Sequence, residues 1–306
     1  MSLFSVVIPS FNRAEMAKEA VESVLGQSFK DVEVIVVDDG SKDNTESVMG
    51  EFGDRIVFHR QANGGVASAR NKGASLATGD YVCYLDSDDL WPENKLEVFA
   101  EVIQRYPEAG FLFSDFRKHN VSLTSPYERS NTDMFPVIYK HAERVEENLF
   151  VLKAREKLEL LLSGYPLYPS TFVVRRDVHE QFRWDPGILK SEDFNFVLRL
   201  SKNFDFLYVD QDLATVRVHE TNKSADFLTK NHTNLLSMKL YRDLYAGAEQ
   251  KDLCNFYISQ RLFLDGRAYL SKGLFRKGFG LIFQSLVYRQ NWSRLAGKVG
   301  ARIRGN

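Results

Sequence analysis

The first 115 residues alternate short apolar runs with segments of helical periodicity, and no other feature limits the fold of this chain as strongly. The runs that predict strands cover residues 4–8, 32–37, 56–59, 81–85 and 110–114. The helices predicted between them cover residues 16–27, 45–52, 66–77 and 95–106. Such alternation is typical of an α/β domain with a mostly parallel sheet flanked by helices.

A polar cluster follows the first, second and fourth predicted strands. The clusters are PSFNR at 9–13, DDGS at 38–41 and DSDD at 86–89. In open α/β sheets, ligands bind beyond the carboxyl ends of the strands. We therefore expect the three clusters to converge in one crevice.

Three carboxylates crowd the last of these clusters. They follow an apolar run, they repel one another and they resist burial, so their charge must be offset. Asp86 and Asp88 are two residues apart, and in an extended chain both side chains point to the same side. Mn²⁺ or Mg²⁺ is commonly held by one or two carboxylates together with substrate phosphates. The alternative is a solvated turn that caps the next helix, which would suffice for Asp89.

The composition and the missing motifs exclude several classes of protein. A formal net charge of −1 gives no overall attraction for nucleic acid. Cys83 and Cys254 offer neither a disulfide framework nor a zinc site, which suits a reducing compartment. There is no export signal, no apolar stretch of the ~20 residues that cross a bilayer, and no glycine-rich dinucleotide or P-loop motif. We therefore expect a cytoplasmic protein.

Five motifs stand in order along the chain, and together they carry a resemblance. They are VVIPSFNR at 6–13, VVDDGS at 36–41, NGG leading to ARN at 63–71, LDSDD at 85–89 and SEDF at 191–194. This series closely resembles the family 2 glycosyltransferases, which have the GT-A fold, and the likeness extends over residues 4 to about 224. It implies inverting transfer of a sugar from a nucleotide-diphosphate sugar, with UDP favoured, in the presence of Mn²⁺ or Mg²⁺.

The resemblance implies a donor site made by Pro9, Phe11, Asp39, Arg70 and Asp86. Phe11 offers a face on which a base can stack, and Asp39 can accept a hydrogen bond from a uracil N–H because a carboxylate is an acceptor. The guanidinium of Arg70 suits the base or the diphosphate. The alternatives are a core aromatic, an ordinary Asp-Gly turn and a surface arginine.

The resemblance also implies the reactive groups. Asp88 becomes the principal metal ligand, with Asp86 beside it, and His219 touches the metal or the diphosphate. Asp193 becomes the general base that takes a proton from the acceptor hydroxyl. The alternative for Asp193 is a helix cap or dipole partner, which is the ordinary role of a carboxylate in a first turn.

The acceptor is expected on the side of Glu192 and Trp91. It would be a hydroxyl of a glycan or a lipid-linked sugar in surface polysaccharide synthesis. The Gln-x-x-Arg-Trp motif of processive synthases is missing, so we expect transfer of one sugar per encounter. Two rival functions are a sugar-phosphate nucleotidyltransferase and a non-catalytic nucleotide-sugar-binding protein.

The pattern divides the chain into two parts. Residues 1–225 are predicted to form the catalytic domain, with a nucleotide-sugar half at 1–118 and an acceptor half at 119–225. Residues 119–155 are polar, and we expect an irregular excursion there. Residues 226–306 are predicted to form a helical extension.

The extension becomes basic and apolar towards its end. Residues 267–304 alternate lysines and arginines with aliphatic and aromatic side chains, and no acidic residue follows Asp265. This pattern is typical of a helix on a membrane surface, here the inner face of the plasma membrane. It is equally typical of helices that pack on the catalytic domain and present a solvated basic face.

Overall fold

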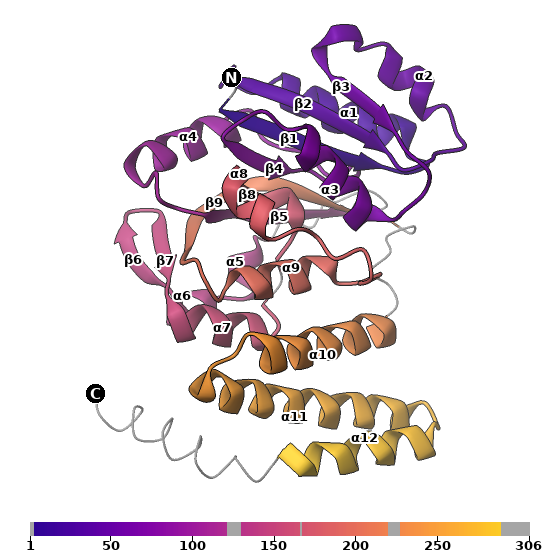
Figure 1. Cartoon of the computed structure of the whole chain (residues 1–306), viewed down its shortest axis with the longest axis vertical. Coiled ribbons are helices and arrows are strands. Elements are labelled where there is room, and N and C mark those ends of the chain that lie inside the picture. Colours follow the sequence, from indigo (N-terminus) through magenta and orange to yellow (C-terminus); the bar gives the residue numbers. More distant parts are fainter. Residues whose placement is uncertain (1–2, 121–129, 166, 220–226, 289–306) are drawn as a thin grey trace.

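The computed structural model describes residues 3–120, 130–165, 167–219 and 227–288. They form an α/β fold in which helices flank a mixed β-sheet (Figure 1). The strands are β1 (Phe4–Ser10), β2 (Val32–Asp38), β3 (Val57–Arg60), β4 (Tyr81–Tyr84), β5 (Phe111–Asn120), β6 (Glu143–Glu146), β7 (Leu149–Leu152), β8 (Phe172–Arg175) and β9 (Phe206–Val218).

The helices in the first half are α1 (Ala14–Leu25), α2 (Thr45–Gly50), the 3₁₀ turn η1 (Gly53–Arg55), α3 (Val66–Leu76) and α4 (Lys95–Arg105). Those that follow are α5 (Asn131–Met134), α6 (Ile138–His141), α7 (Ala154–Leu162), the 3₁₀ turn η2 (Pro169–Thr171), α8 (Arg176–Gln181) and α9 (Glu192–Leu200). The C-terminal helices are α10 (Phe227–Leu244), α11 (Ala248–Ser271) and α12 (Phe275–Tyr288).

The sheet has the strand order β3-β2-β1-β4-β8-β5-β9-β7-β6. The first four strands in this order are parallel, as the sequence predicts. Strand β8 then runs antiparallel to both β4 and β5, β9 is parallel to β5, and the β6–β7 hairpin closes the far edge in antiparallel fashion. The parallel prediction therefore holds for β1 to β4, and the rest of the sheet is mixed.

Strand β1 continues through Pro9 to Ser10, where the sequence predicts a stop. Pro9 lies opposite Val37 of β2. Pairing with β4 has already ended, since the last bond on that side runs from the Leu85 N–H to the Val7 carbonyl. The nitrogen of Pro9 points to the side on which β4 no longer pairs, so an N–H at this position would have had no partner in the sheet. The polar residues at the end of β1 therefore lie where the carboxyl ends of the parallel strands meet.

Helices cover both faces of the parallel strands because neighbouring residues of β1 point to opposite sides. Val6 and Ile8 belong to a core with α1, α2 and α4, and Val7 belongs to a second core with α3, α7 and α9. Helix α3 lies very close to β1. A Cβ on Gly73 would come within 2.2 Å of a Val7 methyl group, so only glycine fits there.

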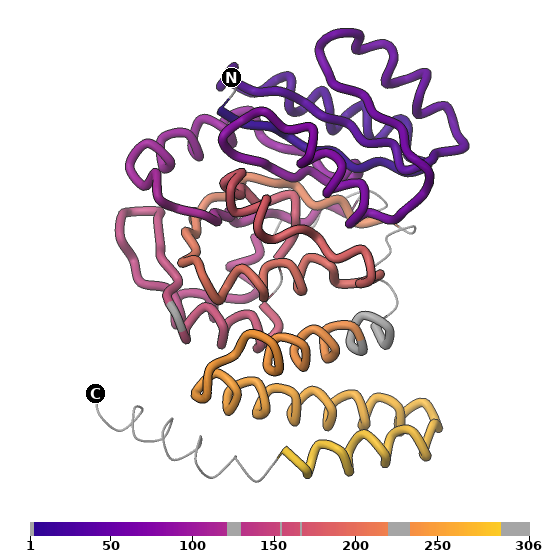
Figure 2. The backbone as a smooth tube through the Cα atoms, in the orientation of Figure 1, coloured from indigo at the N-terminus to yellow at the C-terminus, as the bar shows by residue number. Residues whose placement is uncertain are grey.

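The C-terminal helices form a stack at the end of the molecule away from β3 (Figure 2). Helix α10 packs on α9, α11 packs on α10 and α7, and α12 packs on α11. Buried side chains of α10 and α11, such as Tyr241 and Leu262, belong to the same core as Val7. Helices α10 and α11 therefore pack against the rest of the fold. Within the described ranges, no helix has both the length and the apolar character needed to cross a bilayer.

Three features differ from the sequence prediction. Strand β9 is missing from it, and β5 runs on to Asn120 instead of ending at Ser114. The described part of the stretch 119–155 is not irregular, because it contains α5, α6 and the β6–β7 hairpin. Residues 121–129 lie outside the described residues, as do the predicted boundary at 225/226 and the segment 289–306.

Candidate active site

The carboxylate cluster at 86–89 forms a turn immediately after β4. The turn is closed by a hydrogen bond of 2.9 Å from the Asp89 N–H to the Asp86 carbonyl. Asp89 is buried, and its carboxylate accepts from the Ser170 hydroxyl and from the Arg217 N–H. Ser170 also accepts from the Asp86 N–H at 3.1 Å. Asp89 therefore fixes the turn to η2 and β9, which is a structural role.

The turn carries excess negative charge. Burial raises the pKa of Asp89 well above its usual range, and Asp88 and Asp86 add to that effect. Burial also raises the pKa of Asp86, where the attraction of Arg70 only partly opposes it and Asp88 adds to it. A bound cation would relieve this repulsion.

Asp88 joins three distant parts of the chain. Its Oδ2 atom pairs with the guanidinium of Arg13, just before α1, and lies 3.0 Å from Nε2 of His219, just after β9. Arg217 donates to the backbone carbonyl of Asp88. The fold therefore brings Asp88 and His219, both predicted as site residues, into contact. Arg13 lies in the first motif, but nothing in the sequence indicates that it would pair with Asp88.

The donor set near Asp88 can be compared with what a metal ion requires. In the part of the chain that the structure describes, there is no group of three or more His, Cys, Asp or Glu side chains arranged to hold a metal alone. The Asp88 carboxylate matches the pattern in which one or two carboxylates and the phosphate oxygens of a substrate together hold Mg²⁺ or Mn²⁺, whereas the imidazole beside it is a ligand more typical of Zn²⁺ or Fe²⁺. The residues fit a metal that is shared with the donor.

Arg70 connects the carboxylate turn to the start of α9. The side chain is only 2% exposed, and its Nη2 donates to Oδ1 of Asp86 at 2.6 Å while Nη1 donates to Oε1 of Glu192 at 2.8 Å. Its guanidinium lies 4.5 Å from the centre of the Trp184 ring. Burial alone would lower the pKa of Arg70, but the two carboxylates outweigh it and the pKa is raised. The surface-arginine alternative is therefore wrong.

Asp193 adjoins Glu192 in the first turn of α9. The preceding residue, Ser191, has a left-handed backbone with φ of 56°, which is unusual for a residue other than glycine. Oδ1 of Asp193 accepts from the N–H of Phe194 at 2.7 Å. Since Glu192 is bonded to Arg70 and Arg70 to Asp86, the base predicted at 193 lies at the same edge of the sheet as the carboxylate turn.

The segment before α9 is fixed to α3 by one amide. Asn71 donates from Nδ2 to the carbonyl of Trp184 at 2.8 Å and accepts the Trp184 N–H on Oδ1 at 2.9 Å. Trp184 in turn stacks on Phe196 at 4.1 Å between ring centres. Helix α3 therefore supplies Arg70, which bonds Glu192 of α9, and Asn71, which bonds the segment before α9.

Asp39 shapes the loop in front of α3. Its two oxygens accept from the side-chain amide of Gln61 and from the N–H groups of Gly64 and Gly65, each at 2.8 Å. Gly65 has φ of 85°, a conformation that favours glycine. The aspartate is thus more than part of a plain turn, because it determines where α3 begins.

The first two polar clusters are bonded to each other. The Asn12 N–H donates to Oγ of Ser41 at 2.8 Å, and Oδ1 of Asn12 accepts from the Lys42 N–H at 2.7 Å. Pro9 is buried and Phe11 is half-buried beside this contact. The expected convergence of the clusters at one edge of the sheet is therefore observed.

Trp91 packs in the core. The side chain is buried, its Nε1 donates to the carbonyl of Ser170 at 2.8 Å, and the ammonium of Lys95 lies 4.7 Å from the ring centre. These contacts account for Trp91 without an acceptor. Ser170, which bonds Asp86 and Asp89 of the carboxylate turn, carries no sequence signal that would have singled it out.

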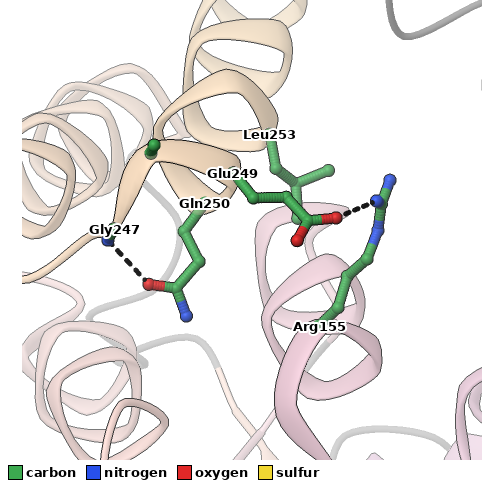
Figure 3. Close-up of a pocket in the computed structure, with 6 residues that line it drawn as sticks. Arg155, Gly247, Glu249, Gln250 and Leu253 are labelled. Atoms are coloured by element: carbon green, nitrogen blue, oxygen red, sulfur yellow. Dashed lines mark hydrogen bonds and ion pairs between the residues drawn. The ribbon is translucent and has the colours of Figure 1, made fainter.

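A separate pocket lies between α7 and the start of α11 (Figure 3). Arg155 pairs there with Glu249 at 2.9 Å, and the Gly247 N–H donates to Oε1 of Gln250 at 3.0 Å. Leu253 completes the wall. None of the residues predicted for the active site lines this pocket.

Sequence comparisons identify the relatives of this chain. The family model described as Glycosyl transferase family 2 matches residues 5–183. An uncharacterized glycosyltransferase of Rickettsia typhi is 33% identical over 256 residues, which cover 81% of this chain and 72% of that protein. The amylovoran biosynthesis glycosyltransferase AmsB of Erwinia amylovora is 30% identical over 229 residues, covering 69% of this chain and 68% of that protein.

Two solved structures share the fold. S. aureus TarS 1–349 in complex with UDP-GlcNAc has a TM-score of 0.60 and 16% identity, and the match covers 98% of this chain and 92% of that one. The mannosyltransferase PcManGT from Pyrobaculum calidifontis, in complex with GDP-Man and Mn²⁺, has a TM-score of 0.63 and 15% identity, covering 99% and 81%. At these identities the likeness establishes the fold.

Proposed function

Because this chain belongs to glycosyl transferase family 2 and is a glycosyltransferase, we propose that it moves one sugar from a UDP-sugar to a hydroxyl of a glycan or lipid-linked acceptor, with inversion. The observation that carries the proposal is the Asp86–Arg70–Glu192 bridge, which joins the carboxylate turn to the helix of Asp193. The name of AmsB supports an acceptor in surface polysaccharide synthesis, and the UDP-GlcNAc complex of TarS supports the nucleotide.

We assign the metal site to Asp88, with Asp86 and His219 as further ligands. The support is the contact between Asp88 and His219 and the Mn²⁺ of the neighbour PcManGT. A divalent ion bound there would offset the charge that develops on the leaving diphosphate. Arg13, which pairs with the same oxygen of Asp88, remains beside the site as a second positive group for that charge.

Asp193 is the proposed general base. It accepts the proton of the acceptor hydroxyl while that oxygen attacks the anomeric carbon and the bond from that carbon to the diphosphate oxygen breaks. A single displacement of this kind inverts the anomeric configuration. Glu192 lies beside the base, and its bond to Arg70 holds the first turn of α9 at the donor.

Arg70 acts in this proposal as a positioning residue. Both of its terminal nitrogens are engaged by carboxylates, and the side chain is almost fully buried. It therefore orients Asp86 and Glu192, and contact with the diphosphate is left to groups nearer the solvent. Pro9, Phe11 and Asp39 are proposed to form the base end of the donor site, as the sequence predicts.

We propose that the reaction takes place in the cytoplasm. Cys83 and Cys254 are both free and buried, as a reducing compartment favours. A peripheral position on the inner face of the plasma membrane would bring a lipid-linked acceptor within reach of the site.

The decisive experiment replaces Asp193 with asparagine. Asp193→Asn should lower turnover roughly 10²–10⁴-fold, because the amide cannot take the proton. Binding of UDP with Mn²⁺, measured by calorimetry, should change little. Glu180→Gln, which alters an exposed carboxylate on α8, serves as the matched control and should keep both properties.

Product analysis completes this test. The anomeric configuration of the product, read by NMR, should be opposite to that of the donor. Near-normal turnover by Asp193→Asn would contradict the assignment of Asp193 as the base. A product with retained configuration would contradict the single-displacement mechanism.

A further inference from the structure

The outer face of α12 exposes large apolar side chains at a spacing of four residues. Phe275, Phe279, Phe283 and Val287 are 61%, 62%, 72% and 69% exposed, and we call them the apolar stripe. Residues four apart lie on the same side of a helix. Isolated exposed apolar residues are ordinary, but a continuous row marks a surface that is covered in use.

The apolar stripe is held on a rigid support. Helices α11 and α12 approach so closely that a Cβ on Gly266 would lie 2.8 Å from the Gly278 carbonyl, and a Cβ on Gly278 would lie 2.8 Å from the Gly266 carbonyl. The Ser259 hydroxyl adds a bond of 2.9 Å to the Ser285 carbonyl. Helix α12 is therefore fixed through its inner face, and the outward direction of the stripe is part of the fold.

Basic side chains lie on the same hairpin as the apolar stripe, near the beginning of α12. The exposed basic residues of the α11–α12 hairpin beyond Asp265 are Arg267, Lys272, Arg276 and Lys277. The sequence from 266 to 306 contains no acidic residue, and residues 289–306 add five arginines and lysines. An apolar helix face flanked by basic side chains matches the headgroup and acyl boundary of an anionic bilayer.

We propose that the outer face of α12 docks on the surface of an anionic lipid bilayer, with the apolar stripe at the acyl boundary and the basic side chains at the headgroups. This deepens the proposed function by naming the surface at which a lipid-linked acceptor is met, yet it does not depend on the assignment of Asp193.

Two other occupants are disfavoured by charge. A second copy of this chain, packed stripe to stripe, would bring two positively charged surfaces together, since a two-fold contact uses the same surface of both subunits and this surface has no acidic residue after Asp265. The segment 289–306 is also basic, so covering α12 with it would again place like charges side by side. Only a partner with a negative surface satisfies both the apolar and the charged parts of this face.

Flotation of the full chain with lipid vesicles tests the docking. The protein should float with vesicles of phosphatidylcholine and phosphatidylglycerol, float less with phosphatidylcholine alone, and be released by high salt. The double variant Phe279→Ser, Phe283→Ser should bind roughly tenfold less tightly or weaker. Charge reversal by Arg276→Glu with Lys277→Glu should weaken binding by roughly fivefold or more per residue.

The matched control is Val57→Ser. Val57 is 45% exposed on β3, at the opposite end of the molecule in Figure 1, so its loss removes an exposed apolar side chain far from α12. This variant should float like the unaltered chain. Donor hydrolysis without vesicles reports on the active site separately, and thermal unfolding confirms that each variant is folded.

Several results would overturn the docking. The full chain could stay with the unbound fraction, or the double serine variant could float as well as the unaltered chain. A dimer in light scattering that the serine variant converts to a monomer would assign the stripe to a second copy. If the protein floats only when residues 289–306 are deleted, that segment covers the apolar stripe in the full chain.

Discussion

At the scale of single residues, Arg70 is the group on which the geometry of the site depends most. The sequence places it on a helix after a glycine pair, and a guanidinium there suits a phosphate. Its partners Asp86 and Glu192 lie 16 and 122 positions away along the chain. No local pattern can reveal a contact of that separation, so the bridge could not be predicted from the sequence.

Replacing Arg70 tests the bridge. Arg70→Met should lower the free energy of unfolding by about 3 kcal/mol, because Asp86 and Glu192 would lose the charge they share. Arg70→Lys should recover part of this stability but little of the turnover, since an ammonium cannot donate in the same fork to both carboxylates. Urea unfolding and steady-state kinetics measure the two effects. The exposed Arg55→Met is the control, and equal losses in it and in Arg70→Met would contradict the bridge.

Lys95 gives the protein a testable dependence on pH. It is fully buried below the carboxylate turn, where its ammonium donates to the Ser170 carbonyl at 3.2 Å. Burial lowers the pKa of Lys95 from 10.5 to about 7. Between these two values the unfolded chain binds a proton that the folded chain has released, so stability rises with pH from about 7 upwards.

The rise should be visible over a short interval. From pH 7.0 to 8.5 the free energy of unfolding should increase by about 2 kcal/mol, and Lys95→Met should remove most of that increase. Staying below pH 9 avoids the Cys83 thiol, because burial raises its pKa to about 12 and gives it the opposite slope. Chemical unfolding at several pH values measures this. The same slope in Lys95→Met would show that another group is responsible.

At the scale of helices and strands, local periodicity predicts the elements of the first half well. The predicted and observed helices there agree to within two residues at each end, because each has an apolar stripe and is followed by a clear break. Strand β9 was missed because Asp210, Gln211 and Asp212 interrupt its apolar run. The polar end of β5 pairs with the second part of β9, so neither strand shows there the pattern that sequence reasoning relies on.

The contact of α3 with β1 can be tested with two matched glycines. Gly73→Ala should destabilise the fold by about 1–3 kcal/mol, because the new Cβ would collide with Val7. Gly280→Ala should stabilise by up to about 1 kcal/mol, because nothing lies within 4 Å of its Cβ and alanine favours a helix. Thermal unfolding measures both. Adding Val7→Ala to the first variant should recover part of the loss, and no recovery would point to a different cause.

At the scale of the whole molecule, the C-terminal helices are part of the catalytic fold. Leu235 of α10 and Leu253 of α11 are buried in the same core as Phe196 of α9. The sequence indicates a helical extension, but the depth of its packing could not be seen. Helical spacing shows which residues are apolar and does not show what they pack against.

Truncation distinguishes an integral extension from an appended one. A chain ending at residue 225 should be poorly soluble and lack cooperative unfolding, because the faces that α10 and α11 cover would be exposed to water. A chain ending at 288 keeps the three described helices and should unfold cooperatively. Expression yield and calorimetry measure this. Cooperative unfolding of the shorter chain at the same temperature would show that residues 1–225 form an independent unit.

The bridge through Arg70 also limits how such enzymes can be recombined. The Arg70 guanidinium balances Asp86, which precedes residue 118, against Glu192, which follows it, so a junction at residue 118 separates charges that offset one another. A chimera that joins the first half of this protein to the second half of a relative will function only where the incoming partner brings an acidic side chain in the place of Glu192. Libraries built by half-exchange should therefore be filtered first for an acidic side chain that can pair with Arg70.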